Sequence, residues 1–385
     1  MKLTIFGLTI SSSWGNGHAT PYRAIVRALH RRGHRVVFYE KDVEYYSLRR
    51  DFSSCDFCEL VLYSDWDEVH ERALRDASDS DVVMTASYFP EGARINDELL
   101  ALPFPLHVFY DLDTPVTLSN LESSDLQYLR RDQIPRFDLV LSWTAGKSLD
   151  ELRNRWRARL VKPLFGCVDP DVYSRVEQFA EFSCDLSYMG TYAADRQQKV
   201  DDLFLEPARR RGDLAFLLAG ALYPWHWQWP ANVRRFDHVA PQQHPALYSS
   251  SRMTLNITRE DMANCGWCPS GRFFEAAACG TPILSDWWEG LNHFFSPGEE
   301  ILVVRNSEDV MRALATADED LRQMASRARE RTLSENTGDH RAEELERYFE
   351  EARSPELKAS ADSVGRTPSP ELSRTSTNPL QNEVL

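Results

Sequence analysis

The chain has 385 residues, a formal net charge of −15 and a sequence pI near 5.2. This excess of acidic side chains disfavours nucleic acid as a partner, because neutralising phosphates requires clustered Lys and Arg. The length exceeds what one compact core usually holds and predicts two domains.

We expect a cytoplasmic protein with no transmembrane segment. The sequence shows no signal-peptide pattern and no apolar run long enough to span a bilayer, and its seven scattered cysteines fit a reducing compartment. Two C-x-x-C pairs, Cys55/Cys58 and Cys265/Cys268, match the spacing of a four-thiolate zinc site. Because they fall in different predicted domains, we interpret them as structural or incidental thiols and predict no metal site.

Short apolar strands alternate with helical segments along the first half of the chain. Between the first two strands, Tyr22, Ile25 and Leu29 recur with the period of a helix. This alternation indicates a parallel sheet with crossover helices, forming an α/β domain over residues 1–170. The predicted strands are residues 3–10, 36–39, 60–63, 82–86, 106–110 and 139–143.

The turn after the first strand, SSSWGNGHATP, is rich in small residues. Gly15, Asn16 and Gly17 let the backbone approach a ligand, and His18 comes directly before a helix. A histidine in this position can act as a general base or hydrogen-bond a sugar hydroxyl. The alternative is a histidine that caps or orders the loop.

Two aspartates follow the strand that ends at Tyr110. Asp111 and Asp113 are two residues apart, so strand alternation points them the same way, and they can orient an imidazole or accept from an acceptor hydroxyl. An Asp-x-Asp pair also suits Mg²⁺ or Mn²⁺, and aspartates often cap turns. The helix-based phosphate site described below makes a metal the less favoured interpretation.

A second series of strands begins after a Pro-containing segment at residues 168–182. It predicts a second doubly wound domain over residues 183–335, then a C-terminal helix at 336–353 and a disordered tail rich in Ser, Pro and Thr at 354–385. Two such sheets facing each other predict one interdomain site at the carboxyl ends of their strands. The predicted strands are residues 186–190, 216–219, 253–257, 283–285 and 301–303.

The segment PSGRFFEAAACGTPILSD predicts a helix opened by Pro and Ser and ended by Gly. Its N-terminus, with Ser270, offers unpaired N–H groups to a phosphate, and the Arg272 guanidinium lies beside them. Glu275, one turn on, suits the hydroxyls of a ribose or sugar. The alternative is an ordinary buried helix.

Further polar residues follow strand ends in this half, namely Gly190, Thr191, Arg196 and Arg259. Three arginines and a helix N-terminus converging on one cleft would neutralise a diphosphate without a metal ion. A nearby aromatic cluster can stack on a sugar or pack under a loop. Its members are Tyr223, Trp225, Trp227 and Trp229.

Several ordered blocks resemble one family. SGRFFEAAACGTPILSD followed by GLNHFFSPGEEILVV is similar to the donor-binding half of group 1 glycosyltransferases, most closely the CgeB-like (spore maturation protein) branch. SSSWGNGHATPYRAIVRALHRRGHRVVFYE resembles the first βαβ unit of the same two-domain GT-B fold. FYDLDTPVTL, YMGTYAADR and LNITRED are also similar to that branch, and the resemblance covers residues 1–350.

The resemblance implies a bacterial-type GT-B enzyme with two Rossmann-like domains, an N-terminal acceptor domain and a C-terminal donor domain. It would transfer a sugar, expected to be a hexose, from a nucleoside diphosphate sugar to an unidentified acceptor, without a metal or other cofactor. Glu275 would bind the nucleotide ribose, and Ser270 and Arg272 would lie near the diphosphate. The other implied phosphate-facing residues are Gly190 and Thr191, with Arg196 nearby.

The two halves resemble enzymes of different stereochemistry. His18 falls where inverting GT-B enzymes with a Gly-His turn place their base, with Asp111 or Asp113 as the orienting partner. The C-terminal half resembles the retaining group, but Trp267 stands where that group has a Glu eight residues before the ribose-binding one. Donor sugar, nucleobase and stereochemistry therefore stay open.

Two other functions fit the same sequence. A nucleotide-sugar epimerase of similar fold would convert a donor sugar without an acceptor. A catalytically silent sugar-nucleotide-binding or scaffold protein would use the tail as its interaction element.

Overall fold

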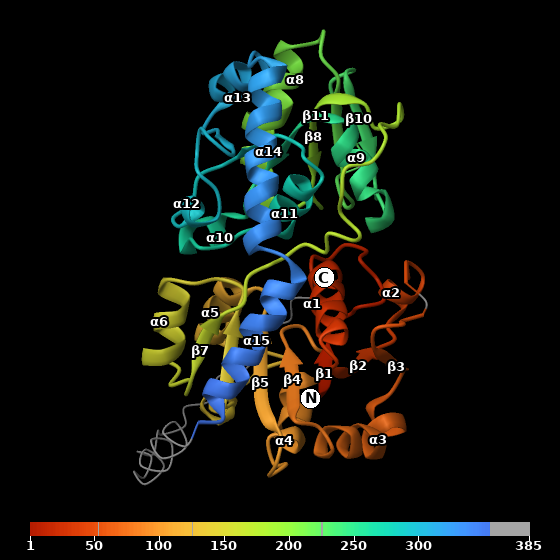
Figure 1. Ribbon diagram of the computed structural model, residues 1–385, viewed down its shortest axis with the longest axis vertical. Coiled ribbons are helices and arrows are strands. Elements are labelled where there is room, and N and C mark those ends of the chain that lie inside the picture. Colours follow the sequence, from red (N-terminus) through yellow and green to blue (C-terminus); the bar gives the residue numbers. More distant parts are fainter. Residues whose placement is uncertain (53, 125, 225, 355–385) are drawn as a thin grey trace.

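The computed structural model describes residues 1–52, 54–124, 126–224 and 226–354. Trp225 and residues 355–385 of the predicted tail lie outside this part. The chain folds into two lobes, each built on its own parallel sheet (Figure 1). None of the helices in the described ranges combines the length and apolar character that crossing a membrane requires.

The N-terminal lobe is a doubly wound sheet. Among the described residues, seven parallel strands lie in the order β3-β2-β1-β4-β5-β6-β7. The central strands are buried on both faces, so they read as continuous apolar runs. The strands are β1 Lys2–Gly7, β2 Arg35–Lys41, β3 Glu59–Tyr63, β4 Val82–Ala86, β5 Leu106–Asp111, β6 Leu139–Ser142 and β7 Val161–Pro163.

Helices cover both faces of this sheet. The first helix buries the predicted Tyr22, Ile25 and Leu29 face and ends in a turn with Gly33 at φ 82°, where glycine is favoured. The helical segments of this lobe are α1 Ala19–Arg31, α2 Glu44–Ser47, α3 Trp66–Ser78, α4 Gly92–Leu99, α5 Thr114–Ser123, η1 Arg131–Arg136 and α6 Lys147–Asn154.

The C-terminal lobe repeats this arrangement with six parallel strands, within the described ranges, in the order β10-β9-β8-β11-β12-β13. Its strands are β8 Cys184–Met189, β9 Phe216–Ala219, β10 Val233–Phe236, β11 Ser251–Asn256, β12 Ile283–Ser285 and β13 Leu302–Val303. The helical segments from β8 onward are α7 Ala194–Val200, η2 Asp201–Leu205, α8 Glu206–Arg210, η3 Pro241–Gln243, α9 His244–Ser250, α10 Glu260–Cys265, α11 Gly271–Ala278, α12 Leu291–Phe294, α13 Ser307–Leu314, α14 Asp318–Glu335 and α15 Gly338–Ala352.

The strand predictions fail in three places. The first strand ends at Gly7 rather than at residue 10, and in the loop that follows the backbone N–H groups of Ile10 and Ser11 donate to the Glu40 carboxylate instead of a neighbouring strand. Strands β7 and β10 were not predicted. Both lie at sheet edges, where a three-residue VKP run and the charged VRRF run lack the apolar pattern of a central strand.

The last helix leaves the C-terminal lobe and packs on the N-terminal one. Helix α14 covers the upper lobe, and α15 lies on the lower lobe beside α1 (Figure 1). A Cβ on Gly338 would lie 2.5 Å from the carbonyl oxygen of Ala24, so glycine allows this close approach. The chain passes between the lobes twice, once near Val168 and once near Gly338, and backbone hydrogen bonds join the two passages. The Val168 N–H donates to the Asn336 carbonyl at 3.1 Å, and the Gly338 N–H donates to the Val168 carbonyl at 2.9 Å.

Candidate active site

Three loops of the N-terminal lobe meet where β1, β4 and β5, neighbours in the sheet, reach their carboxyl ends. His18 comes from the first loop and is buried, with its ring 5.5 Å from that of Tyr88. Burial lowers the pKa of His18, although the nearby Asp113 carboxylate opposes this. The Nδ1 atom of His18 is buried and has no hydrogen-bond partner in the described part of the chain, so the described residues leave this polar atom unsatisfied.

Tyr88 is a member of this cluster that the sequence analysis missed. It follows β4 with φ 61°, a left-handed conformation that costs a bulky residue on the order of 1–3 kcal/mol. Burial and the charge of Asp113 raise the pKa of its hydroxyl well above the usual value. No local sequence signal marks this tyrosine, because the strained backbone that turns it toward His18 is set by the surrounding loops.

The two aspartates have different environments. Asp111 ends β5, is fully buried, and accepts hydrogen bonds from the Asp113 N–H at 3.1 Å and the Thr117 hydroxyl at 3.0 Å. Asp113 is less buried and acts electrostatically on both His18 and Tyr88. Of the two predicted partners of the imidazole, the structure therefore brings Asp113 to His18 and places Asp111 beneath the turn.

Burial gives Asp111 a measurable effect on stability. It raises the pKa of Asp111 to about 7, so the native state holds a proton that the unfolded chain releases near pH 4. The free energy of unfolding should therefore fall as the pH rises from about 4 to 7, by at most about 1.4 kcal/mol per pH unit from this group. Asp111→Asn should remove that slope in urea unfolding measured across the range.

The exposed Asp79 at the end of α3 provides the matched control, because Asp79→Asn removes one carboxylate from a surface position. This variant should keep the slope of the wild-type protein. Equal slopes for the wild type and Asp111→Asn would show that Asp111 holds no extra proton in the native state.

The predicted glycine-rich loop is held by side chains at both ends. Asn16 accepts hydrogen bonds from the N–H groups of His18 at 3.0 Å and Ala19 at 3.2 Å, so Asn16 rather than His18 caps α1. Gly15 has φ 64°, and Gly17 has nothing within 4 Å of a Cβ position. Space is therefore open beside Gly17, whereas a Cβ on Gly15 would meet the hydroxyl of Tyr45. The approach of a ligand to this loop stays a prediction.

Glu40, at the end of β2, anchors the start of this loop and was also missed. Its buried carboxylate accepts from the backbone N–H groups of Ile10 and Ser11, at 2.8 and 3.0 Å, and from the hydroxyls of Thr9 and Ser11, at 2.9 and 2.6 Å. A buried carboxylate with four donors is well satisfied, and it fixes the loop that leads to His18.

In the C-terminal lobe, Arg272 lies over the turn that follows β8. Ser270 caps α11, and its hydroxyl accepts from Arg272 N at 3.4 Å and Nε at 3.0 Å. The guanidinium also donates to the Met189 carbonyl. A Cβ on Gly190 would lie 2.9 Å from Arg272 Nη1 and 2.6 Å from the hydroxyl of Tyr188, so this turn needs glycine to let the guanidinium approach.

The other predicted arginines gather around the same turn. Arg196 is buried, donates to the Thr191 carbonyl, and lies 6.0 Å from the ring of Tyr188. Arg259 pairs with Asp195, its Nε 3.1 Å from the carboxylate. The structure thus brings together Gly190, Thr191, Arg196, Arg259, Ser270 and Arg272 around the β8–α7 turn.

Arg259 links this cationic cluster to the other lobe. Burial opposes its charge, but the carboxylates of Asp195 and of Asp113, which lies in the N-terminal lobe, raise the pKa of Arg259. The Tyr88 hydroxyl also interacts electrostatically with the Arg259 guanidinium. One predicted donor-side residue, Arg259, therefore interacts with the predicted acceptor-side Asp113 between the lobes.

Glu275 lies one turn beyond Arg272 on α11 but is buried against α9. Its Oε2 atom is 3.5 Å from both the hydroxyl of Tyr248 and Nδ1 of His244, and Tyr173 contacts that same Nδ1 at 3.2 Å. These polar neighbours hold the carboxylate beneath the predicted phosphate site. Its predicted contact with a ribose stays a prediction.

Trp267, which replaces the Glu of the group 1 pattern, lies at the contact between the lobes. It has φ 50°, and its N–H donates to the Glu289 carbonyl at 2.6 Å. A Cβ on Gly146 of the N-terminal lobe would lie 2.9 Å from its indole, and Trp143 Nε1 donates to the Pro269 carbonyl at 2.8 Å. The segment that leads into α11 is thus fixed against the first lobe.

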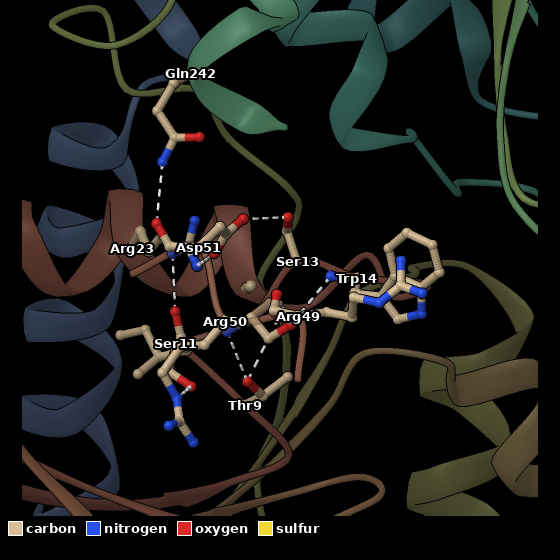
Figure 2. Close-up of polar contacts among 12 residues, drawn as sticks. Thr9, Ser11, Ser13, Trp14, Arg23, Arg49, Arg50, Asp51 and Gln242 are labelled. Atoms are coloured by element: carbon tan, nitrogen blue, oxygen red, sulfur yellow. Dashed lines mark hydrogen bonds and ion pairs between the residues drawn. The ribbon is translucent and has the colours of Figure 1, made fainter. Parts of the chain in front are cut away.

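A second contact between the lobes is drawn in Figure 2. The side chain of Gln242 donates to the Asp51 carbonyl at 3.2 Å, and Asp51 also bonds Ser13 of the glycine-rich loop. Trp14 of the same loop lies between Arg49, at 4.0 Å, and the ring of His238, at 4.9 Å. The loop before His18 therefore touches both lobes.

The two C-x-x-C pairs and the aromatic cluster have ordinary protein neighbours. Cys55 contacts Cys58, with Sγ atoms 2.7 Å apart, and Cys265 Sγ lies 2.8 Å from the Ser148 hydroxyl. No three His, Cys, Asp or Glu side chains in the described ranges gather closely enough to hold a metal ion. In the part of the aromatic cluster that is described, Tyr223, Trp227 and Trp229 pack together with Tyr192 at the edge of the second core.

Solved structures share this architecture over nearly the whole chain. A sucrose-phosphate synthase from Thermosynechococcus elongatus superposes with a TM-score of 0.64 at 13% identity, covering 93% of this chain and 99% of that one. An alpha-glucosyltransferase in complex with UDP-glucose and DNA containing an abasic site gives 0.69 at 13% identity, covering 91% and 99%. The protein has the GT-B fold. Another GT-B structure, Anabaena HepE in complex with UDP and glucose, gives 0.62 at 11% identity, covering 91% and 100%.

A protein family matches part of the chain by sequence. Residues 196–347 of this GT-B protein match the family described as Glycosyl transferase-like. No curated protein sequence matches the chain significantly. The family match spans α7 to α15 and includes the predicted donor-side residues Arg196, Arg259, Ser270, Arg272 and Glu275.

Proposed function

We propose that this GT-B protein, as a member of the CgeB-like branch, transfers a hexose from a nucleoside diphosphate sugar to a hydroxyl-bearing acceptor in the cytoplasm. The observation that carries the proposal is a group of four residues around the β8–α7 turn, Arg196, Arg259, Ser270 and Arg272, all of which lie within the family match. One of them, Arg259, interacts electrostatically with Asp113 and Tyr88 of the N-terminal lobe. The structural neighbours solved with UDP, UDP-glucose or glucose make UDP-glucose the first donor to try.

In this proposal the donor lobe stabilises the leaving diphosphate without a metal ion or other cofactor. The N-terminus of α11, capped by Ser270, offers backbone N–H groups, and Arg272 and Arg196 supply positive charge beside them. Gly190 and Thr191 would bring their backbone close to the phosphates, and Glu275 would bind the ribose. Each of these groups is held by protein contacts before ligand arrives, so little reorganisation is needed.

In the same proposal, the N-terminal lobe would supply the general base that takes the proton from the hydroxyl of the sugar acceptor. Burial lowers the pKa of His18, Asp113 acts electrostatically on it, and the ring of Tyr88 lies 5.5 Å from the imidazole. An acceptor hydroxyl placed against His18 would lose its proton as the new glycosidic bond forms, and Asp113 would stabilise the imidazolium. The net charge of −15 argues that the acceptor is not a nucleic acid.

Ligand-dependent unfolding tests the donor site. Purified protein should be stabilised by one nucleotide family among UDP, GDP, dTDP and CDP, by about 2.7 kcal/mol at a hundred times the dissociation constant, and EDTA should leave the shift unchanged. The absence of a shift with every nucleotide and sugar conjugate would refute the donor site, and a shift that EDTA abolishes would refute metal independence. Nucleotide release that depends on an added acceptor separates a transferase from an epimerase or a silent binding protein.

A further inference from the structure

The Cys55/Cys58 pair lies between α2 and β3, outside the cleft. The two Sγ atoms are 2.7 Å apart, closer than two sulfur atoms in ordinary van der Waals contact, and both side chains are partly exposed. Cys58 immediately precedes β3, so its position is fixed by the sheet. The pair is therefore held face to face by the fold and is reachable from solvent.

The two sulfur atoms differ in their surroundings. The hydrogen bond from Cys58 and the backbone N–H groups of Phe57 and Cys58 lower the pKa of Cys55, although burial and Asp56 oppose this. The same bond to Cys55, together with burial, raises the pKa of Cys58. Cys55 is thus the better thiolate and Cys58 the thiol that bonds to it, the asymmetry that thiol–disulfide exchange requires.

The second C-x-x-C pair offers an internal comparison. Cys265 Sγ lies 2.8 Å from the hydroxyl of Ser148 on the other lobe, and Cys268 is 2% exposed. Between them, Gly266 and Trp267 have φ values of 75° and 50°, so the backbone departs from a regular turn. With identical spacing, these two thiols thus have different environments, one hydrogen-bonded to a serine hydroxyl and the other fully buried.

We propose that Cys55 and Cys58 form a reversible dithiol–disulfide site whose oxidant is a small-molecule disulfide such as oxidised glutathione. The Cys55 thiolate attacks one sulfur of the oxidant, which releases one thiolate and leaves a mixed disulfide on Cys55. Cys58, on losing its proton to solvent, attacks Cys55 Sγ and displaces the second thiolate. The protein dithiol loses two electrons, and the oxidant gains them as two thiols.

The segment that carries this site supports the loop of the candidate active site. Arg27 of α1 lies 4.5 Å over the ring of Phe57, and Arg23 lies 5.1 Å over that of Phe52. Arg23 also forms an ion pair with Asp51 at 2.5 Å. The disulfide would therefore form in a segment packed on the helix that begins beside His18.

The test uses the full chain equilibrated in buffers of reduced and oxidised glutathione, followed by acid quenching, alkylation and peptide mapping. We expect a Cys55–Cys58 disulfide at least about tenfold more abundant than any Cys265–Cys268 disulfide, and reversal by excess reduced glutathione. In Cys58→Ser, Cys55 should accumulate as the glutathione mixed disulfide, whereas Cys55→Ser should accumulate much less adduct at Cys58.

Circular dichroism of each variant verifies that the fold is retained, and Cys265→Ser, which should oxidise like the wild type, is the matched control. Persistent alkylation of both Cys55 and Cys58 in the folded, glutathione-oxidised protein would overturn the proposal. Equal oxidation of the two C-x-x-C pairs would also overturn it, because the proposed reactivity comes from the local fold and not from the spacing. Neither readout depends on transferase activity.

Discussion

Arg272→Ala is expected to lower kcat/KM for the sugar donor by about 10²–10³-fold, the effect of removing one positioned donor from a site of developing charge. The guanidinium lies at the carboxyl end of β8, fixed by Ser270 and by the Met189 carbonyl. Without this guanidinium, one positive charge beside the departing diphosphate would be missing. Initial rates with UDP-glucose and the UDP-induced shift in unfolding temperature provide two readouts of the same site.

The stability of Arg272→Ala should change much less than its catalytic rate. The variant removes the guanidinium that donates to the Ser270 hydroxyl and the Met189 carbonyl, which should lower the free energy of unfolding by about 1–3 kcal/mol. Arg272→Lys keeps the charge but not the forked geometry and should recover only part of the rate. Arg322→Ala on the exposed face of α14 is the matched control, with 61% of that side chain exposed. Wild-type turnover in folded Arg272→Ala would remove Arg272 from the mechanism.

His18→Ala is expected to lower turnover by about 10²–10⁴-fold, the usual contribution of a positioned general base. Burial lowers the pKa of His18, so its imidazole stays neutral to a lower pH than that of an ordinary histidine. The rate of the wild type should therefore be level around neutral pH and fall only in solution more acid than that in which an ordinary histidine titrates. The variant should lose this acidic limb.

His30 provides the control for this variant, because it is exposed near the end of the same helix, α1. His30→Ala should keep both the rate and the pH profile. An acidic limb that persists in His18→Ala would assign the titration to another group and leave His18 with a role in ordering the loop.

The sequence predicted much of the donor side. The run from Pro269 to Asp286 carries a helix start, a helix stop and a following strand within a short stretch, so its structure depends on local capping and propensity. The gathering of Arg196, Arg259 and Arg272 followed from one rule, that the carboxyl ends of parallel strands share an edge. Local signals and one topological rule were sufficient for this half.

The acceptor side depended on contacts that no local pattern contains. Tyr88 joins His18 through a left-handed backbone, and Glu40 holds the loop from the next strand. The sequence offered Asp111 and Asp113 as equivalent partners, but burial separates them, placing one beneath the turn and the other beside the imidazole. These assignments depend on depth and on neighbours from other loops.

By itself, the sequence determined the two α/β series, the helix that carries Arg272 and the glycine-rich turn before His18, because periodicity, capping and turn chemistry act between neighbouring residues. The tertiary structure decided the edge strands β7 and β10, the return of α15 to the first lobe and the place of Trp267 between the lobes. The strand order β1-β4-β5 brought His18, Tyr88 and Asp113 together. Such contacts are set by which strands become neighbours and how closely the lobes pack, and residues far apart in the chain decide both.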